Sequence, residues 1–291
     1  MPSHGLAAEE AGVKLRSLLF VPGNRPERFG KALASGADAV ILDLEDAVAP
    51  AAKPKARDAV AAFLAGPRGG RVFVRINPLD GDSADEDLAA AVGADGIVLP
   101  KAEGAESVRR LDALLGDSAV PILPIATETS RAIFQLGSYA DVATHLAGLT
   151  WGAEDLPAAI GAATSREADG RYTPPYELVR SLALFAAHAA DVAAIDTVYP
   201  ALKDADGLAA YAGRAARDGF TGMLALHPAQ VETINRAFTP DADTLDRARR
   251  IAEAFEREPG AGALQVDGRM VDAPHLKQAL RLLSLGERSK G

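Results

Sequence analysis

Short apolar runs alternate with longer amphipathic stretches over most of the chain. Ala-rich segments with helical periodicity, such as PERFGKALAS and KPKARDAVAAFLAG, separate the apolar runs. Continuous apolar strands separated by helices are typical of a parallel sheet that is covered on both faces. Eight such units predict an α/β protein with a closed (β/α)8 TIM barrel. The expected strands are 16–22, 39–44, 71–77, 96–100, 120–125, 145–150, 194–199 and 222–226.

An open, doubly wound parallel sheet is the competing architecture for this pattern. The first strand-to-helix turn reads VPGNRPERFG and lacks the GxGxxG fingerprint that a dinucleotide-binding sheet needs. A barrel of about 250 residues with an extension also fits the length, which is 291 residues. The sequence therefore favours the barrel.

The pattern changes after Thr239. A long charged helix is predicted over about 241–258, and EPGAGA follows it as a flexible joint. Asp267 and Gly268 are typical of a hairpin turn, and a last helix follows the hairpin. We expect this extension either to pack beneath the barrel or to reach over an active site as a lid. The predicted division is a flexible tail over 1–14, a (β/α)8 catalytic barrel over 15–239 and a C-terminal helical and hairpin extension over 240–291.

Charge and cysteine content exclude several classes of protein. The formal net charge is −9, which makes nucleic acid and anionic membranes poor partners. The chain has no cysteine, so it has no disulfide, thiol nucleophile or cysteine-based metal site. The first residues lack the apolar core of a signal peptide, and the apolar stretch SLALFAAHAADVAAI is too short to span a bilayer. We expect a cytoplasmic protein that binds neither nucleic acid nor membrane.

Two carboxylates follow apolar runs at the predicted carboxyl ends of strands. Glu128 comes after VPILPIAT, and Asp155 comes after HLAGLTWGAE. In an α/β barrel this end of the strands carries the chemistry. Oxygen ligands without Cys or His nearby suit Mg²⁺, which takes one or two carboxylates and keeps water or substrate elsewhere. The alternative is that each acid caps the helix that follows it, but the presence of both acids beside an arginine at another strand end favours Mg²⁺.

That arginine is Arg75, at the end of the strand FVRIN. Its guanidinium suits a substrate carboxylate or a developing oxyanion, and an internal salt bridge to Glu45 or Asp46 is the alternative. Lys101, in VLPKAE, also follows a strand. It is predicted to be a surface or ion-paired lysine rather than a Schiff-base nucleophile, because nothing near it in sequence supplies an apolar pocket that would lower its pKa.

Seven segments resemble, in their order along the chain, the citrate lyase beta-subunit family of the HpcH/HpaI aldolase superfamily, whose members are Mg²⁺-dependent barrels. The resemblance covers the chain from about residue 15 to its end, and the series is more specific than any one segment. The segments are RSLLFVPGNRPERFGKA, VILDLEDAVAP, FVRIN, VLPKAE, PIATETSRAI, LTWGAEDL and ALHPAQV.

The resemblance implies roles for four residues. Arg75, in the VRxN strand, would contact substrate and act in catalysis. Glu128, in the ETxxA segment, would bind both metal and substrate, and Asp155, in the GxEDL segment, would be the second metal ligand. Asp272, in GRMVDAP, matches the segment from which malyl-CoA and citramalyl-CoA lyases supply a catalytic aspartate to a neighbouring subunit. Sequence position alone places Asp272 in a helix-cap region.

The resemblance also implies a reaction. It is the Mg²⁺-dependent cleavage or formation of a carbon–carbon bond in a 3-hydroxyacyl-CoA thioester, such as malyl-CoA, citramalyl-CoA or citryl-CoA, with a 2-keto acid such as oxaloacetate and acetyl-CoA on the other side. Asp272 favours free CoA thioesters, and the family implies a homotrimer or a multiple of trimers, with 240–291 as a lid on a neighbouring subunit. The alternatives are a citrate lyase beta subunit that needs an acyl carrier protein, hydrolysis of the same thioester, and a non-catalytic barrel that binds a dicarboxylate or CoA.

Overall fold

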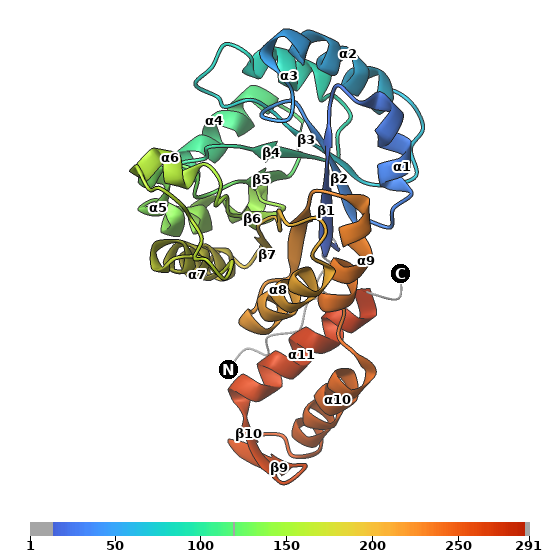
Figure 1. Cartoon of the computed structure of the whole chain (residues 1–291). Helices are drawn as coiled ribbons and strands as arrows, with labels where there is room; N and C mark the ends of the chain where they lie inside the picture. Colours follow the sequence, from blue (N-terminus) through green and yellow to red (C-terminus); the bar gives the residue numbers. More distant parts are fainter. Residues whose placement is uncertain (1–13, 119, 289–291) are drawn as a thin grey trace. The chain divides into compact units, whose positions relative to one another are not determined.

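The structure is a computed structural model that describes residues 14–118 and 120–288. Eight parallel strands form one sheet that curves into a nearly closed barrel with helices around it, so the predicted (β/α)8 TIM barrel is confirmed (Figure 1). Seven of the strands lie within predicted apolar runs, and β7 overlaps its run but begins one residue earlier. The strands are β1 Ser17–Pro22, β2 Ala39–Asp43, β3 Val72–Arg75, β4 Gly96–Leu99, β5 Ile122–Pro124, β6 Gly148–Thr150, β7 Ala193–Asp196 and β8 Gly222–Ala225.

The helices bury one face each against the sheet. Helix α2, for example, buries Ala56, Val60 and Leu64, which recur every four residues and therefore share one side of the helix. The helices of the barrel are α1 Phe29–Leu33, α2 Lys53–Leu64, α3 Ala84–Ala90, α4 Ala105–Leu115, α5 Ser130–Ile133, α6 Leu156–Ile160, α7 Pro174–Ala189, α8 Ala205–Asp218 and α9 Pro228–Ala237. Three 3₁₀ segments accompany them, η1 Pro26–Arg28, η2 Pro50–Ala52 and η3 Leu136–His145.

The barrel has a seam between β5 and β6. Hydrogen-bonded neighbours follow the order β5-β4-β3-β2-β1-β8-β7-β6, so β5 and β6 are the two ends of the ladder. They meet through isolated parallel bridges, Ile122 with Leu146 and Ile125 with Thr150. The seam is thus joined by isolated bridges, whereas consecutive residues pair at the other junctions.

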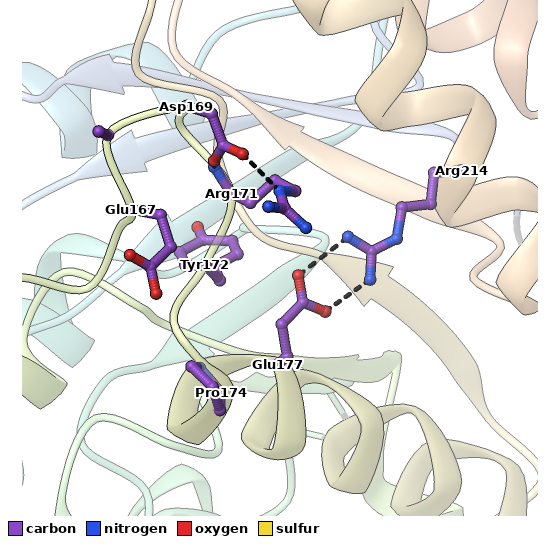
Figure 2. Close-up of a pocket in the computed structure, with 8 residues that line it drawn as sticks. Glu167, Asp169, Arg171, Tyr172, Pro174, Glu177 and Arg214 are labelled. Carbon is purple, nitrogen blue, oxygen red and sulfur yellow. Dashed lines mark hydrogen bonds and ion pairs between the residues drawn. The ribbon is translucent and has the colours of Figure 1, made fainter.

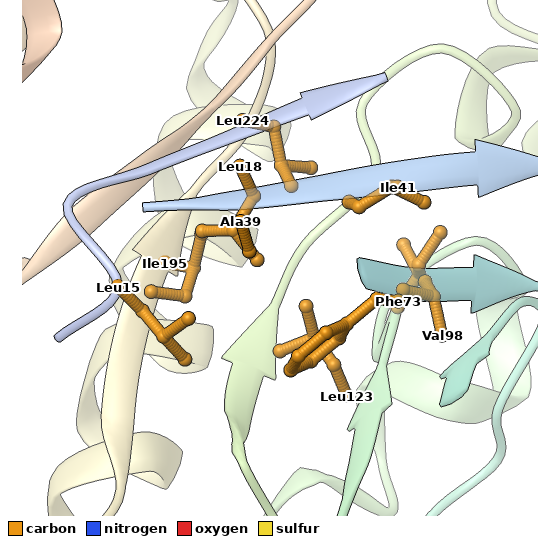
Figure 3. Packing of buried hydrophobic residues seen from close by; sticks show 10 residues of the cluster. Leu15, Leu18, Ala39, Ile41, Phe73, Val98, Leu123, Ile195 and Leu224 are labelled. Carbon is orange, nitrogen blue, oxygen red and sulfur yellow. The ribbon is translucent and has the colours of Figure 1, made fainter. Parts of the chain in front are cut away.

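Apolar side chains from the strands fill the barrel. Phe73 of β3 and Leu123 of β5 meet residues from β1, β2, β4, β7 and β8 in one cluster (Figure 3). Gly96 makes room for the ring of Phe73, because a Cβ atom at that position would lie 2.7 Å from it. The buried members are Leu15, Leu18, Ala39, Ile41, Phe73, Val98, Leu123, Ile125, Ile195 and Leu224.

Residues from Arg236 onward form a second compact unit, and the barrel unit covers Leu15–Asn235. The second unit contains helices α10 Ala242–Arg257 and α11 Ala273–Arg288 and strands β9 Ala263–Val266 and β10 Arg269–Asp272. The strands pair antiparallel. Asp267 and Gly268 join them with φ values of 50° and 72°, so the predicted hairpin turn is confirmed.

The small core of the second unit comes from both helices and from β10. Its buried members are Ala248, Ile251, Val271 and Ala279. Apart from Lys14, the predicted tail over 1–14 lies outside the described residues. Within the part of the chain that the structure describes, no helix combines the length and apolar character needed to cross a membrane.

Candidate functional site

Arg75 is held by an acid on the neighbouring strand. The Cα atoms of Arg75 and Asp43 are partners in the β2–β3 register, so the two side chains leave the barrel side by side. Arg75 Nε donates to Asp43 Oδ1 at 2.8 Å, and Nη2 donates to Oδ2 at 2.7 Å. This bidentate pair uses one edge of the guanidinium and leaves Nη1 directed elsewhere. Burial opposes the charge of Arg75, but the hydrogen bonds and charge of Asp43 outweigh burial and raise the pKa of Arg75.

The remaining nitrogen of Arg75 approaches a second acid. Nη1 lies 2.9 Å from Glu45 Oε2, whereas Asp46 lies 4.0 Å away and its side chain is 60% exposed. The predicted internal salt bridge therefore exists with Glu45, and Asp46 is peripheral. The principal partner is Asp43, which was not among the predicted partners.

Lys101 connects three carboxylates at the carboxyl ends of the strands. Its Nζ donates to Glu45 Oε1 at 2.7 Å and lies 3.6 Å from Asp155 Oδ1. Its backbone N–H donates to Glu128 Oε2 at 2.6 Å. Burial disfavours the ammonium charge, but the hydrogen bond to Glu45 and the nearby carboxylates outweigh burial and raise the pKa of Lys101. A raised pKa keeps the amine protonated, so the predicted ion-paired lysine is confirmed and Schiff-base chemistry is disfavoured.

Glu128 is almost fully buried, with 4% of its surface exposed. Burial raises the pKa of Glu128 to about 8, the charges of Glu45 and Asp155 act in the same direction, and the backbone hydrogen bond from Lys101 opposes them. With a pKa of about 8, the Glu128 carboxyl is mostly protonated at neutral pH even beside Lys101. A further cation bound next to it would favour the charged form.

Neither proposed metal ligand has a side chain that caps a helix. Thr129, not Glu128, caps α5, because the Thr129 hydroxyl accepts from the backbone N–H of Ala132. Asp155 occupies the N-cap position of α6, but its side chain makes no capping hydrogen bond. The capping alternative is therefore wrong for Glu128. Asp155 has the N-cap position but not the capping hydrogen bond.

The cluster carries more negative than positive charge. Four carboxylates lie around two cations, Arg75 and Lys101, so two negative charges are in excess when all the acids are ionised. Among residues 14–118 and 120–288 no three His, Cys, Asp or Glu side chains converge as ligands of one metal ion. Mg²⁺ does not need three, because it is commonly held by one or two carboxylates with water and substrate. The all-oxygen donor set and the excess charge therefore fit Mg²⁺. The four carboxylates belong to Asp43, Glu45, Glu128 and Asp155.

Asp272 lies outside the barrel unit. It ends β10, and its side chain is 42% exposed and pairs with His275 one turn into α11. The backbone N–H of His275 also points to Asp272 Oδ1, at 3.5 Å, as the helix-cap interpretation predicts. The hydrogen bond from His275 lowers the pKa of Asp272, so this carboxylate is ionised at neutral pH.

A buried network beside the cluster was not predicted. Asp196, at the end of β7, accepts from Trp151 Nε1 at 2.6 Å and from Arg180 Nε and Nη2 at 3.0 and 2.7 Å. Tyr211 donates to the same carboxylate at 3.1 Å. Asp196 is an acid at the end of a strand, which is the same feature that indicates Asp155. The apolar run AIDTVY predicts a strand that ends at Tyr199, so Asp196 is expected inside the strand and not at its end.

A separate pocket of about 820 Å³ lies at the start of α7 (Figure 2). Four of its five charged side chains pair with one another, since Arg171 pairs with Asp169 and Arg214 pairs with Glu177. None of the candidate metal or substrate residues lines it. Its size therefore does not make it the reactive site.

The sequence is similar to a known protein family and to individual relatives. The model of the HpcH/HpaI aldolase/citrate lyase family matches residues 16–228. The chain is 42% identical over 270 residues to a citrate lyase subunit beta-like protein of Mycobacterium tuberculosis, which covers 91% of this chain and 93% of that protein. It is 34% identical over 283 residues to a (3S)-malyl-CoA thioesterase of Cereibacter sphaeroides, with 94% of each chain covered.

A solved structure is similar over nearly the whole chain. It is the crystal structure of the protein CitE from Mycobacterium tuberculosis in complex with magnesium, acetoacetate and coenzyme A, with a TM-score of 0.79 and 38% identity. The match covers 94% of this chain and 98% of the other. The barrel, the order of the motifs and these similarities lead to one conclusion: the chain belongs to the HpcH/HpaI aldolase/citrate lyase family.

Proposed function

We propose that the protein is a Mg²⁺-dependent carbon–carbon lyase that acts on a 3-hydroxyacyl-CoA thioester. The observation that carries this proposal is the acidic cluster at the carboxyl ends of the strands, in which buried Glu128 and partly exposed Asp155 share Lys101. Similar proteins support the ligand classes, since one solved relative contains magnesium, acetoacetate and coenzyme A. The substrate has an acyl thioester at one end and a hydroxyl next to a carboxylate at the other.

Glu128 and Asp155 would hold the metal ion. When bound, Mg²⁺ supplies a Lewis acid and a template for the oxygens of the hydroxy acid. Arg75 would place Nη1 toward the substrate oxygen that gains negative charge, because Asp43 already fixes the other edge of the guanidinium. Lys101 would hold the two ligand-bearing segments in place through its contacts with both acids.

The reaction balances without a redox partner. The hydroxyl on C3 loses its proton and becomes the carbonyl of a 2-keto acid, while the bond between C2 and C3 breaks. Its electron pair remains on C2 as the enolate of the acyl thioester, which then takes a proton at C2. In the condensation direction, the ionised and accessible carboxylate of Asp272 from another copy of the chain would take this proton from C2, and in the cleavage direction its protonated form would return the proton to C2. This arrangement requires an oligomer, and we propose a homotrimer in which the extension over 240–291 covers a neighbour's barrel.

Hydrolysis of the thioester is the second candidate. It is favoured by the similarity to a (3S)-malyl-CoA thioesterase, which is 34% identical to this chain. The same residues would hold the substrate, with water attacking the thioester carbonyl in place of C–C bond cleavage.

A product analysis of the purified protein tests both candidates. Malyl-CoA, citramalyl-CoA and citryl-CoA are each incubated with and without Mg²⁺, and the products are separated by chromatography. A 2-keto acid together with acetyl-CoA identifies the lyase, whereas the hydroxy acid together with free CoA identifies the thioesterase. Turnover that needs an acyl carrier protein would indicate a citrate lyase beta subunit. Binding of Mg²⁺ and oxaloacetate without turnover of any thioester would contradict both candidates.

Metal affinity is expected to rise with pH up to about pH 8 and then to level off. Burial raises the pKa of Glu128 to about 8, so below that value Mg²⁺ must displace a proton from the carboxyl. The dissociation constant should increase about tenfold for each pH unit below 8. Isothermal titration calorimetry in buffers of different ionisation enthalpy would measure both the affinity and the released proton. An affinity that is independent of pH between 6 and 8 contradicts the role of Glu128.

The same shift predicts the stability of the metal-free protein. Because the folded-state pKa of Glu128 lies above its unfolded value, the folded protein binds more protons between about pH 4.5 and 8. Stability is therefore full below this window and falls as the pH rises through it. In Glu128→Gln, the melting temperature should therefore fall less than in the wild type as the pH rises from about 4.5 to 8.

Replacement of Asp272 with asparagine is expected to slow proton transfer at C2 while metal affinity stays unchanged. The loss of a general acid–base group costs about 10²–10⁴ in rate, and substitution at this exposed site should leave the fold intact. Exchange of the acetyl-CoA methyl protons in ²H₂O, followed by NMR, measures the step directly. Asp267→Asn is the matched control, because Asp267 is an exposed acid of the same hairpin that pairs with Arg250. Equal exchange rates in the two variants would remove Asp272 from the mechanism.

A further inference from the structure

The two proposed metal ligands lie on opposite sides of the barrel seam. Glu128 follows β5 and Asp155 follows β6, and these are the two strands at the ends of the hydrogen-bonded order. Past Ile125, the backbone N–H of Ala126 donates to the carbonyl of Thr150 at 2.9 Å. The distance between the two carboxylates therefore depends on a junction that has only isolated bridges.

One side chain continues this junction beyond the last bridge. Thr127 is fully buried, and its hydroxyl donates to the carbonyl of Gly152 and accepts from the N–H of Gly152, each at 3.1 Å. A hydroxyl can do both at once, which a methyl group cannot. Thr127 immediately precedes Glu128, and Gly152 lies three residues before Asp155. The Thr127–Gly152 pair therefore takes the place of a backbone hydrogen bond between strands, where the segments that carry Glu128 and Asp155 leave β5 and β6.

The glycine also lets the two segments approach closely. A Cβ atom on Gly152 would lie 2.8 Å from Cγ of Glu128 and 3.1 Å from Cγ2 of Ile125. The backbone of the β6 segment is thus packed directly against the side chain of Glu128. Any widening of the seam would move Asp155 away from Glu128 and leave the buried side chain without this contact.

The β6 segment is fixed on its other side as well. Trp151 is fully buried and donates from Nε1 to Asp196 Oδ1 at 2.6 Å, and Asp196 is held in turn by Arg180. This network ties residue 151 to β7, while Thr127 ties residue 152 to β5. The Thr127 contact follows the Ala126–Thr150 hydrogen bond along the seam and therefore helps to set the position of the β6 segment relative to Glu128.

We propose that Thr127 is a positioning residue that sets the spacing of Glu128 and Asp155 across the β5–β6 seam, so that metal affinity depends on the Thr127–Gly152 contact. The proposal rests on the proposed metal site. Because Glu128 and Asp155 would hold the cation from the two sides of the seam, binding should stabilise the closed barrel in proportion to its affinity.

Three proteins test the proposal by their affinity for Mg²⁺ and Mn²⁺, measured by calorimetry and by the EPR signal of free Mn²⁺. Thr127→Val keeps the shape of the side chain but removes both hydrogen bonds, and it should weaken binding about 10- to 100-fold, as loss of a group that orients a metal ligand does. Thr127→Ser keeps the hydroxyl and should stay within about threefold of the wild type. Equal affinity of the valine variant and the wild type would overturn the proposal.

Thr221→Val is the matched control for a purely structural effect. The hydroxyl of Thr221 also donates to a neighbouring strand, to the carbonyl of Ala194 at 3.2 Å, but it precedes β8 at the opposite end of the barrel. Both valine variants should lower the melting temperature of the metal-free protein. The gain in melting temperature on adding Mg²⁺ should shrink only in Thr127→Val. An equal gain in both variants contradicts the proposal.

The wild-type protein separates the remaining outcomes. If it binds neither Mg²⁺ nor Mn²⁺, the proposed metal site fails and this inference fails with it, whereas binding that Thr127→Val does not change overturns the inference alone. Hydrogen exchange gives a readout that needs no variant. Addition of Mg²⁺ should slow exchange of the seam amides of Ala126, Ala147 and Gly152 at least tenfold more than exchange in β1 and β2, because metal binding opposes opening of the seam. Equal protection of both regions would overturn the inference even if Thr127→Val fails to fold.

Discussion

Asp155→Asn is expected to reduce turnover by about 10³-fold or more, because the proposed metal ion would contribute several kcal/mol of charge stabilisation that a weakly bound ion would not supply. Asparagine keeps the size of the side chain but removes one of the two charges that would hold Mg²⁺. The metal-free protein should remain folded. Asp155 is one-third exposed, and its loss removes one of the negative charges that raise the pKa of Glu128.

The measurement is the Mg²⁺ dependence of turnover together with a calorimetric titration. The variant should require a far higher Mg²⁺ concentration, and its residual rate should not be restored by more substrate. Glu154→Gln is the control, because Glu154 is an exposed acid in the same segment and carries the same charge. Normal turnover of Asp155→Asn at low Mg²⁺ would show that Asp155 is not a ligand.

The barrel could be predicted from the sequence because its strands are local patterns. Each apolar run is short, continuous and bounded by turn residues. A strand that is buried on both faces can therefore be predicted from its own residues. The hairpin at Asp267 and Gly268 could be predicted for a similar reason, since both residues tolerate the positive φ values that the turn requires. The β5–β6 seam could not be predicted from the sequence, because the hydrogen-bond partners across it depend on how the whole set of strands closes the barrel.

The candidate site was only partly visible in the sequence. Glu128 and Asp155 stand out because each follows a buried strand, where a charge needs a partner or a ligand. Asp43 was missed because it ends the run AVILD and looks like part of the strand, while its pairing with Arg75 comes from the β2–β3 register. Thr127 was missed for a related reason. A threonine in an apolar run carries no signal until its partner, Gly152, is placed beside it.

The role of Asp272 could not be derived from local patterns at all. Its position after a hairpin and before a helix predicts a cap, and the contact with His275 agrees with that interpretation. The proposed catalytic role comes only from the resemblance to lyases that supply this aspartate between subunits. A contact between two copies of a chain leaves no periodicity in one copy, so physical reasoning on a single chain stops at this point.

Arg75→Lys is expected to lower kcat/KM by about 10²–10³, the usual cost of losing one aligned donor to a developing negative charge. A lysine has one nitrogen, which cannot bind both oxygens of Asp43 and also reach Glu45 and the substrate. The loss should appear mainly in kcat, because the proposed contact strengthens as the substrate oxygen becomes negative. Steady-state kinetics with malyl-CoA at saturating Mg²⁺ would separate kcat from KM.

Arg16→Lys controls for the broken ion pair. Arg16 donates from Nε and Nη2 to the two oxygens of Asp38, both at 2.9 Å, in the same bidentate geometry. It precedes β1, however, and Asp38 precedes β2, so the pair lies at the amino ends of the strands, away from the acidic cluster. Both variants should lose similar stability, about 1–3 kcal/mol for charge-assisted hydrogen bonds. Only Arg75→Lys should lose turnover, and an equal loss in both would mean that Arg75 supports the fold alone.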